Sequence, residues 1–193
     1  MKVIVKVSGL LFLFLSVSCY AATPETTATP APAPAVTKPA TQHTFPETLE
    51  LGGKSWKLDN FQADNNLTLG EYVTANQTVN NWQELITFQK FNFTMSKNFT
   101  PKLFADKEAE ELRNQKLKII YNLISSNEQE AMMEFRVEEP TKDQQDELQR
   151  IVLTPDQRLV ILHYVIKKSD MGETERKVWL EALKSIDVSK LKP

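Results

Sequence analysis

Alternation of apolar and polar side chains is the feature that most constrains this fold, and it is clearest over residues 130–138. Ala131, Met133, Phe135 and Val137 alternate there with polar residues and Met132. A period of two predicts an antiparallel strand with one face toward solvent. Similar apolar patterns predict strands at 67–72, 83–94, 117–125, 148–153 and 158–167, and a hairpin over 48–58 that turns at Gly52-Gly53.

Two segments carry helical signals instead. Thr100 can cap a helix, and Pro101 is tolerated at its first position, which predicts a helix over 101–115. Trp179, Ala182, Leu183 and Ile186 recur at helical spacing and predict a helix over 173–186. The order of elements predicts an α+β domain: one antiparallel sheet of about six or seven strands, with both helices packed on it.

The N-terminus reads as an export signal. Lys2 and Lys6 precede an apolar run over 7–17, which is shorter than the ~20 residues that cross a bilayer. We expect cleavage after Ala21, and the alternative is lipidation at Cys19, the only cysteine. Residues 22–47 are rich in Pro, Ala and Thr, which predicts a disordered tether. The expected organisation is therefore signal peptide 1–21, tether 22–47 and a single domain 48–193, located in the periplasm or outside the cell.

The composition and the absence of known motifs argue against several classes of function. Without Lys2 and Lys6 the charge is 21 − 25 = −4, and no stretch concentrates Lys and Arg, so nucleic-acid binding is not expected. No second apolar run predicts a transmembrane segment in the mature form. Phosphate-loop, nucleophile-elbow and zinc-protease motifs are absent from the sequence. His43 and His163 are the only histidines, and no cysteine follows Cys19, so we expect neither a metal site nor a cofactor.

A pattern follows in the middle of the chain: Glu71-Tyr72-Val73, then Thr78-Val79, Asn81-Trp82 and Glu84-Leu85-Ile86-Thr87. It resembles a pattern of small exported bacterial proteins of uncharacterised function. The order of elements is also similar to the Mog1/PsbP-like α/β/α sandwich, with a cystatin-like or NTF2-like curved sheet as the next alternative. The Mog1/PsbP-like resemblance implies an adaptor or assembly factor rather than an enzyme.

The best candidates for a shared site are Glu71, Tyr72, Trp82 and Thr87. They could form a binding notch with Trp82 as its aromatic anchor, or a structural corner in which Trp82 fills the end of the sheet. The expected function is a non-catalytic protein-interaction module of the periplasm, cell envelope or secreted fraction. One alternative is an envelope hydrolase using His163 with a carboxylate from another strand. The other is a carrier of small apolar ligands, with a cavity lined by Phe88, Phe91, Phe93, Met132 and Met133.

Overall fold

The computed structural model describes residues 6–7, 10–11, 45–115 and 117–191. The chain divides into two compact units, Met1–His43 and Thr44–Pro193. In the first unit, β1 (Lys6–Val7) pairs antiparallel with β2 (Leu10–Leu11). The rest of the expected signal peptide, including Cys19 and Ala21, and the tether as far as residue 44 lie outside the described residues.

In the second unit, eight described strands form one antiparallel sheet in the order β3-β4-β5-β6-β10-β9-β8-β7. The first four strands along the chain are neighbours, and so are the last four. Strand β10 joins the two halves by pairing with β6. The strands are β3 (Thr48–Leu51), β4 (Lys54–Ala63), β5 (Leu67–Val73), β6 (Glu84–Phe91), β7 (Lys118–Ser126), β8 (Glu130–Glu139), β9 (Gln145–Leu153) and β10 (Leu159–Ile166).

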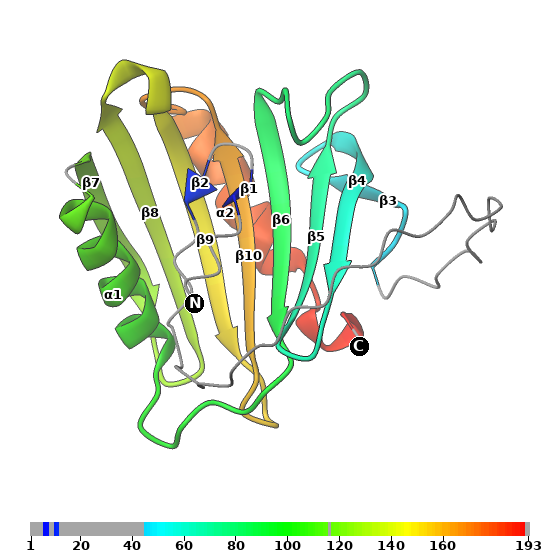
Figure 1. The fold of residues 1–193 in the computed structure, drawn as a ribbon, viewed down its shortest axis with the longest axis vertical. Coiled ribbons are helices and arrows are strands. Elements are labelled where there is room, and N and C mark those ends of the chain that lie inside the picture. Colours follow the sequence, from blue (N-terminus) through cyan, green and yellow to red (C-terminus); the bar gives the residue numbers. More distant parts are fainter. Residues whose placement is uncertain (1–5, 8–9, 12–44, 116, 192–193) are drawn as a thin grey trace, which may run out of the picture. The chain divides into compact units, whose positions relative to one another are not determined.

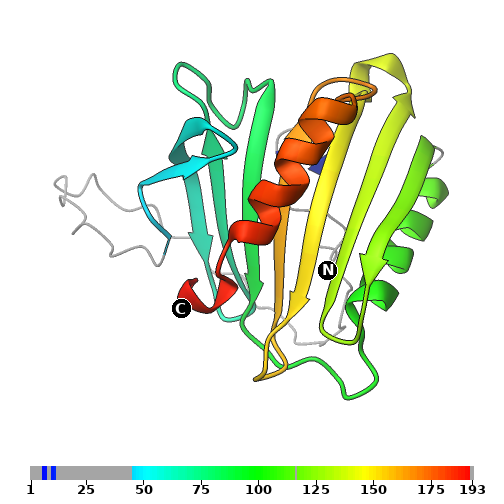
Figure 2. The ribbon, with the colours of Figure 1, turned by 180° about the vertical axis from the view of Figure 1, so that it is seen from behind.

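Two helices cover opposite faces of this sheet. Helix α1 (Pro101–Asn114) contacts β7, β8 and β9 and lies in front of the sheet in Figure 1. Helix α2 (Glu173–Ser185) contacts β9 and β10 and lies in front in the reverse view of Figure 2. Short 3₁₀ turns occupy Thr141–Asp143 (η1) and Val188–Lys190 (η2). We call the two sides of the sheet the α1 face and the α2 face.

The larger hydrophobic core lies on the α2 face. Trp179 of α2 stacks on Tyr164 of β10, with ring centroids 3.6 Å apart, and meets Trp56 of β4 edge to face at 5.6 Å. All three side chains are fully buried. The β3–β4 turn brings Gly52 against this group, because a Cβ atom at Gly52 would lie 2.7 Å from the Trp179 ring. The aromatic group therefore fixes α2 and the hairpin together.

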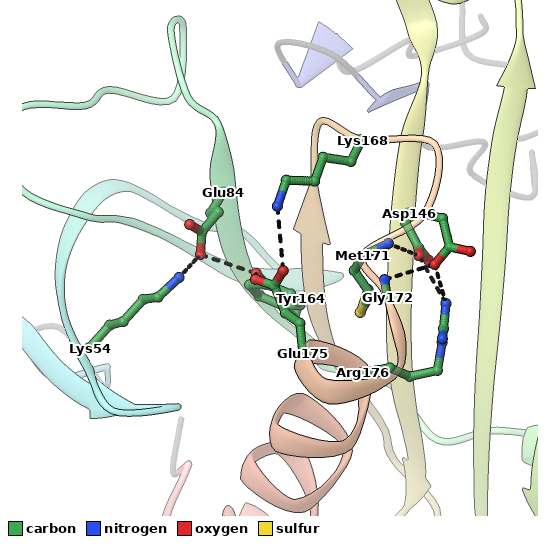
Figure 3. Close-up of polar contacts among 10 residues, drawn as sticks. Lys54, Glu84, Asp146, Tyr164, Lys168, Met171, Gly172, Glu175 and Arg176 are labelled. Atoms are coloured by element: carbon green, nitrogen blue, oxygen red, sulfur yellow. Dashed lines mark hydrogen bonds and ion pairs between the residues drawn. The ribbon is translucent and has the colours of Figure 1, made fainter.

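Polar contacts hold α2 at both ends. Near its start, Asp146 Oδ2 accepts a hydrogen bond from the Met171 backbone N–H at 2.7 Å and lies 3.4 Å from the Arg176 guanidinium (Figure 3). At its end, Arg150 Nη1 of β9 lies within 3.1 Å of three carbonyl oxygens, those of Leu183, Lys184 and Ile186. The last carbonyls of a helix lack partners within it, so Arg150 supplies the donor they need.

A second network connects α2 to β6 and β10. The Tyr164 hydroxyl lies 2.9 Å from Glu175 Oε1 and 3.1 Å from Glu84 Oε2 (Figure 3). Lys54 pairs with Glu84, and Lys168 Nζ lies 3.5 Å from Glu175 Oε2. The carboxylates beside Tyr164 therefore each have a lysine partner, which lowers the cost of placing two negative groups together.

The sequence predicts the helices closely. The expected helix over 101–115 is Pro101–Asn114, and the Thr100 side chain accepts a hydrogen bond from Leu103 N as a cap should. The expected helix over 173–186 is Glu173–Ser185. The α+β class and the single antiparallel sheet are confirmed, but the sheet has eight strands rather than six or seven.

Three local predictions are wrong. Strand β8 has no solvent face, because Met132 is buried and Glu134 pairs with Arg176 of α2 at 2.6 Å. The charged stretch over 140–147 indicates a loop in the sequence, but residues 145–147 begin β9, with all three side chains buried. Gly70 interrupts the apolar alternation of its strand, which indicates a bulge, but the register shift lies in β4 between Leu58 and Asn60.

A glycine is needed at position 70 for a different structural reason. A Cβ atom there would lie 2.5 Å from the Phe45 ring, so Gly70 allows Phe45 to pack against β5. Phe45 is itself buried and meets Phe61 and Phe88 edge to face, each at 6.0 Å. Phe45 lies at the end of the expected tether, yet it belongs to the core.

Candidate functional site

A row of polar side chains crosses five adjacent strands on the α1 face. The strand register places them directly opposite one another in the order Asn60, Glu71, Thr87, His163 and Gln149, from β4 through β5, β6 and β10 to β9. We call these five residues the polar row. All except Asn60 are buried. Buried positions on a sheet face are normally apolar, so a continuous polar row needs a specific explanation.

Glu147 organises the β9 end of the row. Its Oε1 atom lies 2.6 Å from His163 Nδ1 and accepts a hydrogen bond from Gln149 Nε2 at 2.9 Å. Gln149 Nε2 also lies 3.1 Å from Glu108 Oε1 of α1. Helix α1 therefore contributes a third carboxyl group beside the row, that of Glu108, whose side chain reaches the sheet.

The row contains more acceptor atoms than donors. Asn60 Nδ2 donates to Glu71 Oε2 at 2.6 Å, but Glu71 Oε1 is buried without a hydrogen-bond partner. The same holds for Glu147 Oε2, Glu108 Oε2 and Gln149 Oε1. A buried polar atom without a partner costs about 1–3 kcal/mol. Four such acceptors on one face therefore favour anything that brings N–H donors and positive charge.

Burial changes the acidity of two of these carboxyls. Burial is the main cause that raises the pKa of Glu108 to about 7; His163 and the hydrogen bond from Gln149 oppose this rise, and the Glu147 carboxylate adds to it. Burial also raises the pKa of Glu71, opposed by its hydrogen bond from Asn60 and by His163. Near neutral pH the Glu108 carboxyl therefore exists in both its protonated and its ionised form, so a cationic group that binds beside it would displace a proton.

The described helices leave part of this face without a helix in front of it. In Figure 1, α1 lies over the β7–β8 side of the sheet, and neither described helix lies in front of β5 or β6. Glu71 of β5 and Thr87 of β6 therefore belong to the half of the row away from α1. His163 and Gln149 lie on β10 and β9, between that half and Glu108.

The structure brings three of the four expected site residues to one face. Glu71 and Thr87 are directly opposite each other in the row. Trp82 lies on the same face with Val73, Leu85 and Val165, is 2% exposed, and has the Lys167 ammonium 4.4 Å above its ring. Tyr72 points to the α2 face instead, where its hydroxyl donates to Pro46 O at 3.0 Å.

The sequence suggested a carboxylate from another strand beside His163 but did not identify it as Glu147, nor Glu108 as its neighbour. Alternation along β10 places His163 on the same side as Leu159, Ile161 and Val165. In the sequence, Glu147 ends a charged stretch that is typical of a loop, and Glu108 belongs to an acidic stretch that is typical of the solvated side of a helix. One signal was available: Glu147 and Gln149 are two residues apart, so in a strand they share a face.

Other expected features lie elsewhere. The five side chains proposed to line a carrier cavity do not share one face, since Phe88 and Met132 belong to the α2-face core and Phe93 is 46% exposed. Among the described residues, no group of three or more His, Cys, Asp or Glu side chains is placed to hold a metal ion. Across the same residues, none of the helices has the length and apolar character needed to cross a membrane.

Comparison with known proteins gives a family but no relative of known activity. None of the curated proteins matches the chain. A family model matches residues 43–192, which include every strand of the eight-stranded sheet, both helices and the whole polar row. The chain therefore belongs to this family, whose function is uncharacterised.

Proposed function

We propose that the protein is an exported, non-catalytic interaction module that binds a cationic segment of a protein or envelope component at the polar row. The observation that carries this proposal is the set of four buried acceptor atoms without donors, on Glu71, Glu108, Glu147 and Gln149. A lysine ammonium offers three N–H groups and an arginine guanidinium five, and either would pair with these acceptors. Trp82 packs at the end of the same face, beside the proposed binding site.

Export and fold relationship form part of the same proposal. The charged start, the short apolar run and the small residues before Ala22 support a cleaved signal peptide and a periplasmic or secreted location. One antiparallel sheet with a helix on each face supports a Mog1/PsbP-like sandwich. That architecture is compatible with an adaptor, whose binding surface is a sheet face rather than a catalytic cleft.

The test is binding of a lysine- and arginine-containing oligopeptide, measured by calorimetry at two salt concentrations. Glu71→Gln and Glu108→Gln each remove a negative charge from the site, and we expect each to weaken binding about tenfold. Two exposed carboxylates provide matched controls: Glu50→Gln on β3 and Glu110→Gln on the outer side of α1 should bind as the original protein does.

The control variants distinguish binding of the peptide at the polar row from its attraction to the acidic surface as a whole. If all four variants lose affinity equally, the acidic protein attracts the peptide without using the row, and the proposal fails. It also fails if the original protein does not bind the peptide at low salt. Far-UV circular dichroism of each variant shows whether a loss of binding reflects loss of fold.

One observation favours a second candidate function, an envelope hydrolase. The 2.6 Å contact between Glu147 Oε1 and His163 Nδ1 is the arrangement in which a carboxylate orients a histidine base. Thr87 lies directly opposite His163 and could supply a hydroxyl. His163 and Glu71 are each 1% exposed, so both candidate functions require this face to open to a ligand. Ester hydrolysis that is lost in His163→Gln but kept in Glu110→Gln would favour this candidate over the first.

A further inference from the structure

A pocket of about 550 Å³ lies on the α2 face, at the end of the sheet where β9 turns into β10. Its sides come from that turn, from the β7–β8 turn, from the end of β6 and from η2. Its apolar lining consists of Val152, Leu153, Pro155, Val160, Val188 and Leu191. The volume is within the range of small-molecule sites, about 300–1,000 Å³. The polar row is on the opposite face, so the two sites are separate.

Lys90 is the buried charge in this pocket. It lies near the end of β6, opposite Val160, and is 7% exposed. Its Nζ atom donates to the Leu191 carbonyl oxygen at 3.1 Å. Among the described residues it forms no ion pair with a carboxylate. An ammonium carries three N–H groups, and a buried charge normally has a paired counter-charge.

The other charged groups of the pocket already have partners. Arg158 Nε lies 3.1 Å from Asp156 Oδ2, and Glu130 Oε2 lies 2.8 Å from Arg150 Nη2. Burial is the main cause that lowers the pKa of Lys90, and the nearby Arg158 lowers it further; Asp156 opposes them only in part, so the ammonium lacks a fully compensating negative charge. An anion beside Lys90 and Arg158 would supply that charge.

We propose that this pocket binds a small amphipathic carboxylate, with its anionic group at Lys90 and Arg158 and its apolar chain along Val160, Val188 and Leu191. The lining of the pocket matches both the anionic head and the apolar chain of such a ligand. A carboxylate accepts the remaining Lys90 N–H donors, and an alkyl chain covers apolar walls that a purely ionic ligand would leave in water. This site lies on the other face of the sheet from the polar row and takes an anionic rather than a cationic ligand, so it is independent of the proposed function.

Head-group dependence tests the proposal in the unaltered protein. The full chain is titrated with decanoate, decanol and decyltrimethylammonium, and binding is followed by calorimetry and by amide chemical shifts. We expect decanoate to bind at least about tenfold more tightly than decanol, and the cationic amphiphile to bind more weakly still. Shift changes should appear at Lys90, Val160 and Val188 and not at Glu71 or Thr87. Equal affinity for decanoate and decanol, or shifts centred on the polar row, would overturn the proposal.

Variants then test the role of Lys90. Lys90→Met keeps the length of the side chain but removes its charge, and we expect about a tenfold loss of decanoate affinity with decanol affinity unchanged. Lys97→Met removes an exposed lysine and should leave both affinities unchanged. If Lys90→Met does not fold, Arg158→Gln takes its place, and a decanoate affinity equal to that of the original protein would contradict the proposal.

Discussion

The paired glycines of the β3–β4 turn allow a close test of how the hairpin packs on α2. Gly52 and Gly53 both have positive φ, +60° and +73°. An alanine at either position must adopt a left-handed conformation, which destabilises the folded state by roughly 1–2 kcal/mol. Alanine also lowers the conformational entropy of the unfolded chain, which stabilises the folded state by about 0.4–1 kcal/mol. These two contributions should be similar at the two positions, and they partly cancel.

Only Gly52 has a neighbour that a methyl group would strike. A Cβ atom there would lie 2.7 Å from Cη2 and 2.8 Å from Cζ2 of Trp179, whereas a Cβ atom at Gly53 meets nothing within 4 Å. Trp179 cannot turn away, because it stacks on Tyr164 and is buried. Overpacking a fixed core typically costs about 1–3 kcal/mol. We therefore expect Gly53→Ala to lose roughly 1 kcal/mol, and Gly52→Ala to lose about 1–3 kcal/mol more.

Urea unfolding measures the difference, followed by tryptophan fluorescence and far-UV circular dichroism in parallel. The comparison requires equal denaturant slopes in the two variants. Near-UV circular dichroism should change in Gly52→Ala alone, because only that substitution disturbs the Trp179–Tyr164 stack. Two variants within about 0.5 kcal/mol of each other would refute the argued contact between the turn and α2.

Further predictions concern charge and the N-terminus. Burial raises the pKa of Asp146 to about 7, so the folded state binds this proton more tightly than the unfolded state. The free energy of unfolding should therefore fall as pH rises from about 4 to about 7, by on the order of 3 kcal/mol. In Asp146→Asn this slope, measured by urea unfolding at several pH values, should become shallower. An unchanged slope would contradict the assignment. Arg150→Met leaves the last carbonyls of α2 without a donor and should cost about 2–4 kcal/mol in thermal or urea unfolding, and a loss below about 0.5 kcal/mol would exclude that capping role. Mass spectrometry of the exported protein should find a mature N-terminus at Ala22, whereas an acylated Cys19 would show a lipoprotein.

The success of the helix predictions has a local cause. Thr100-Pro101 and the spacing of Trp179 and Leu183 are determined within a few residues, and so is the turn at Gly52-Gly53. The environment of each strand was harder to predict. Whether the polar side of β8 faces solvent depends on which element packs against it, and that element, α2, lies far away in the sequence. Glu134 looks solvated in the sequence, and it is buried only because Arg176, 42 positions later, reaches it from α2.

The candidate site shows the same limit. Glu71 and Thr87 were selected from a pattern in which they are 16 residues apart, and strand pairing places them opposite each other. Their other neighbours in the row come from β9, β10 and β4. No local signal connects Gln149 or Glu147 with Glu71, since only the insertion of β10 beside β6 brings those segments together. Trp82 was considered both as an anchor and as a filler of the sheet end, and its burial supports the second description.

The pairing of β6 with β10 also determines when the sheet can be completed. Lys90 pairs with Val160, so this contact closes a loop of 160 − 90 = 70 residues, whereas the other neighbouring strands are consecutive in the chain. During synthesis, β3 to β6 can pair as soon as they emerge, but β6 keeps an open edge until the last strand has been made. That edge belongs to a strand containing Leu85, Ile86 and Phe88, which favours pairing with another chain. Chains that stop before Leu159 should consequently aggregate rather than form a soluble half-domain.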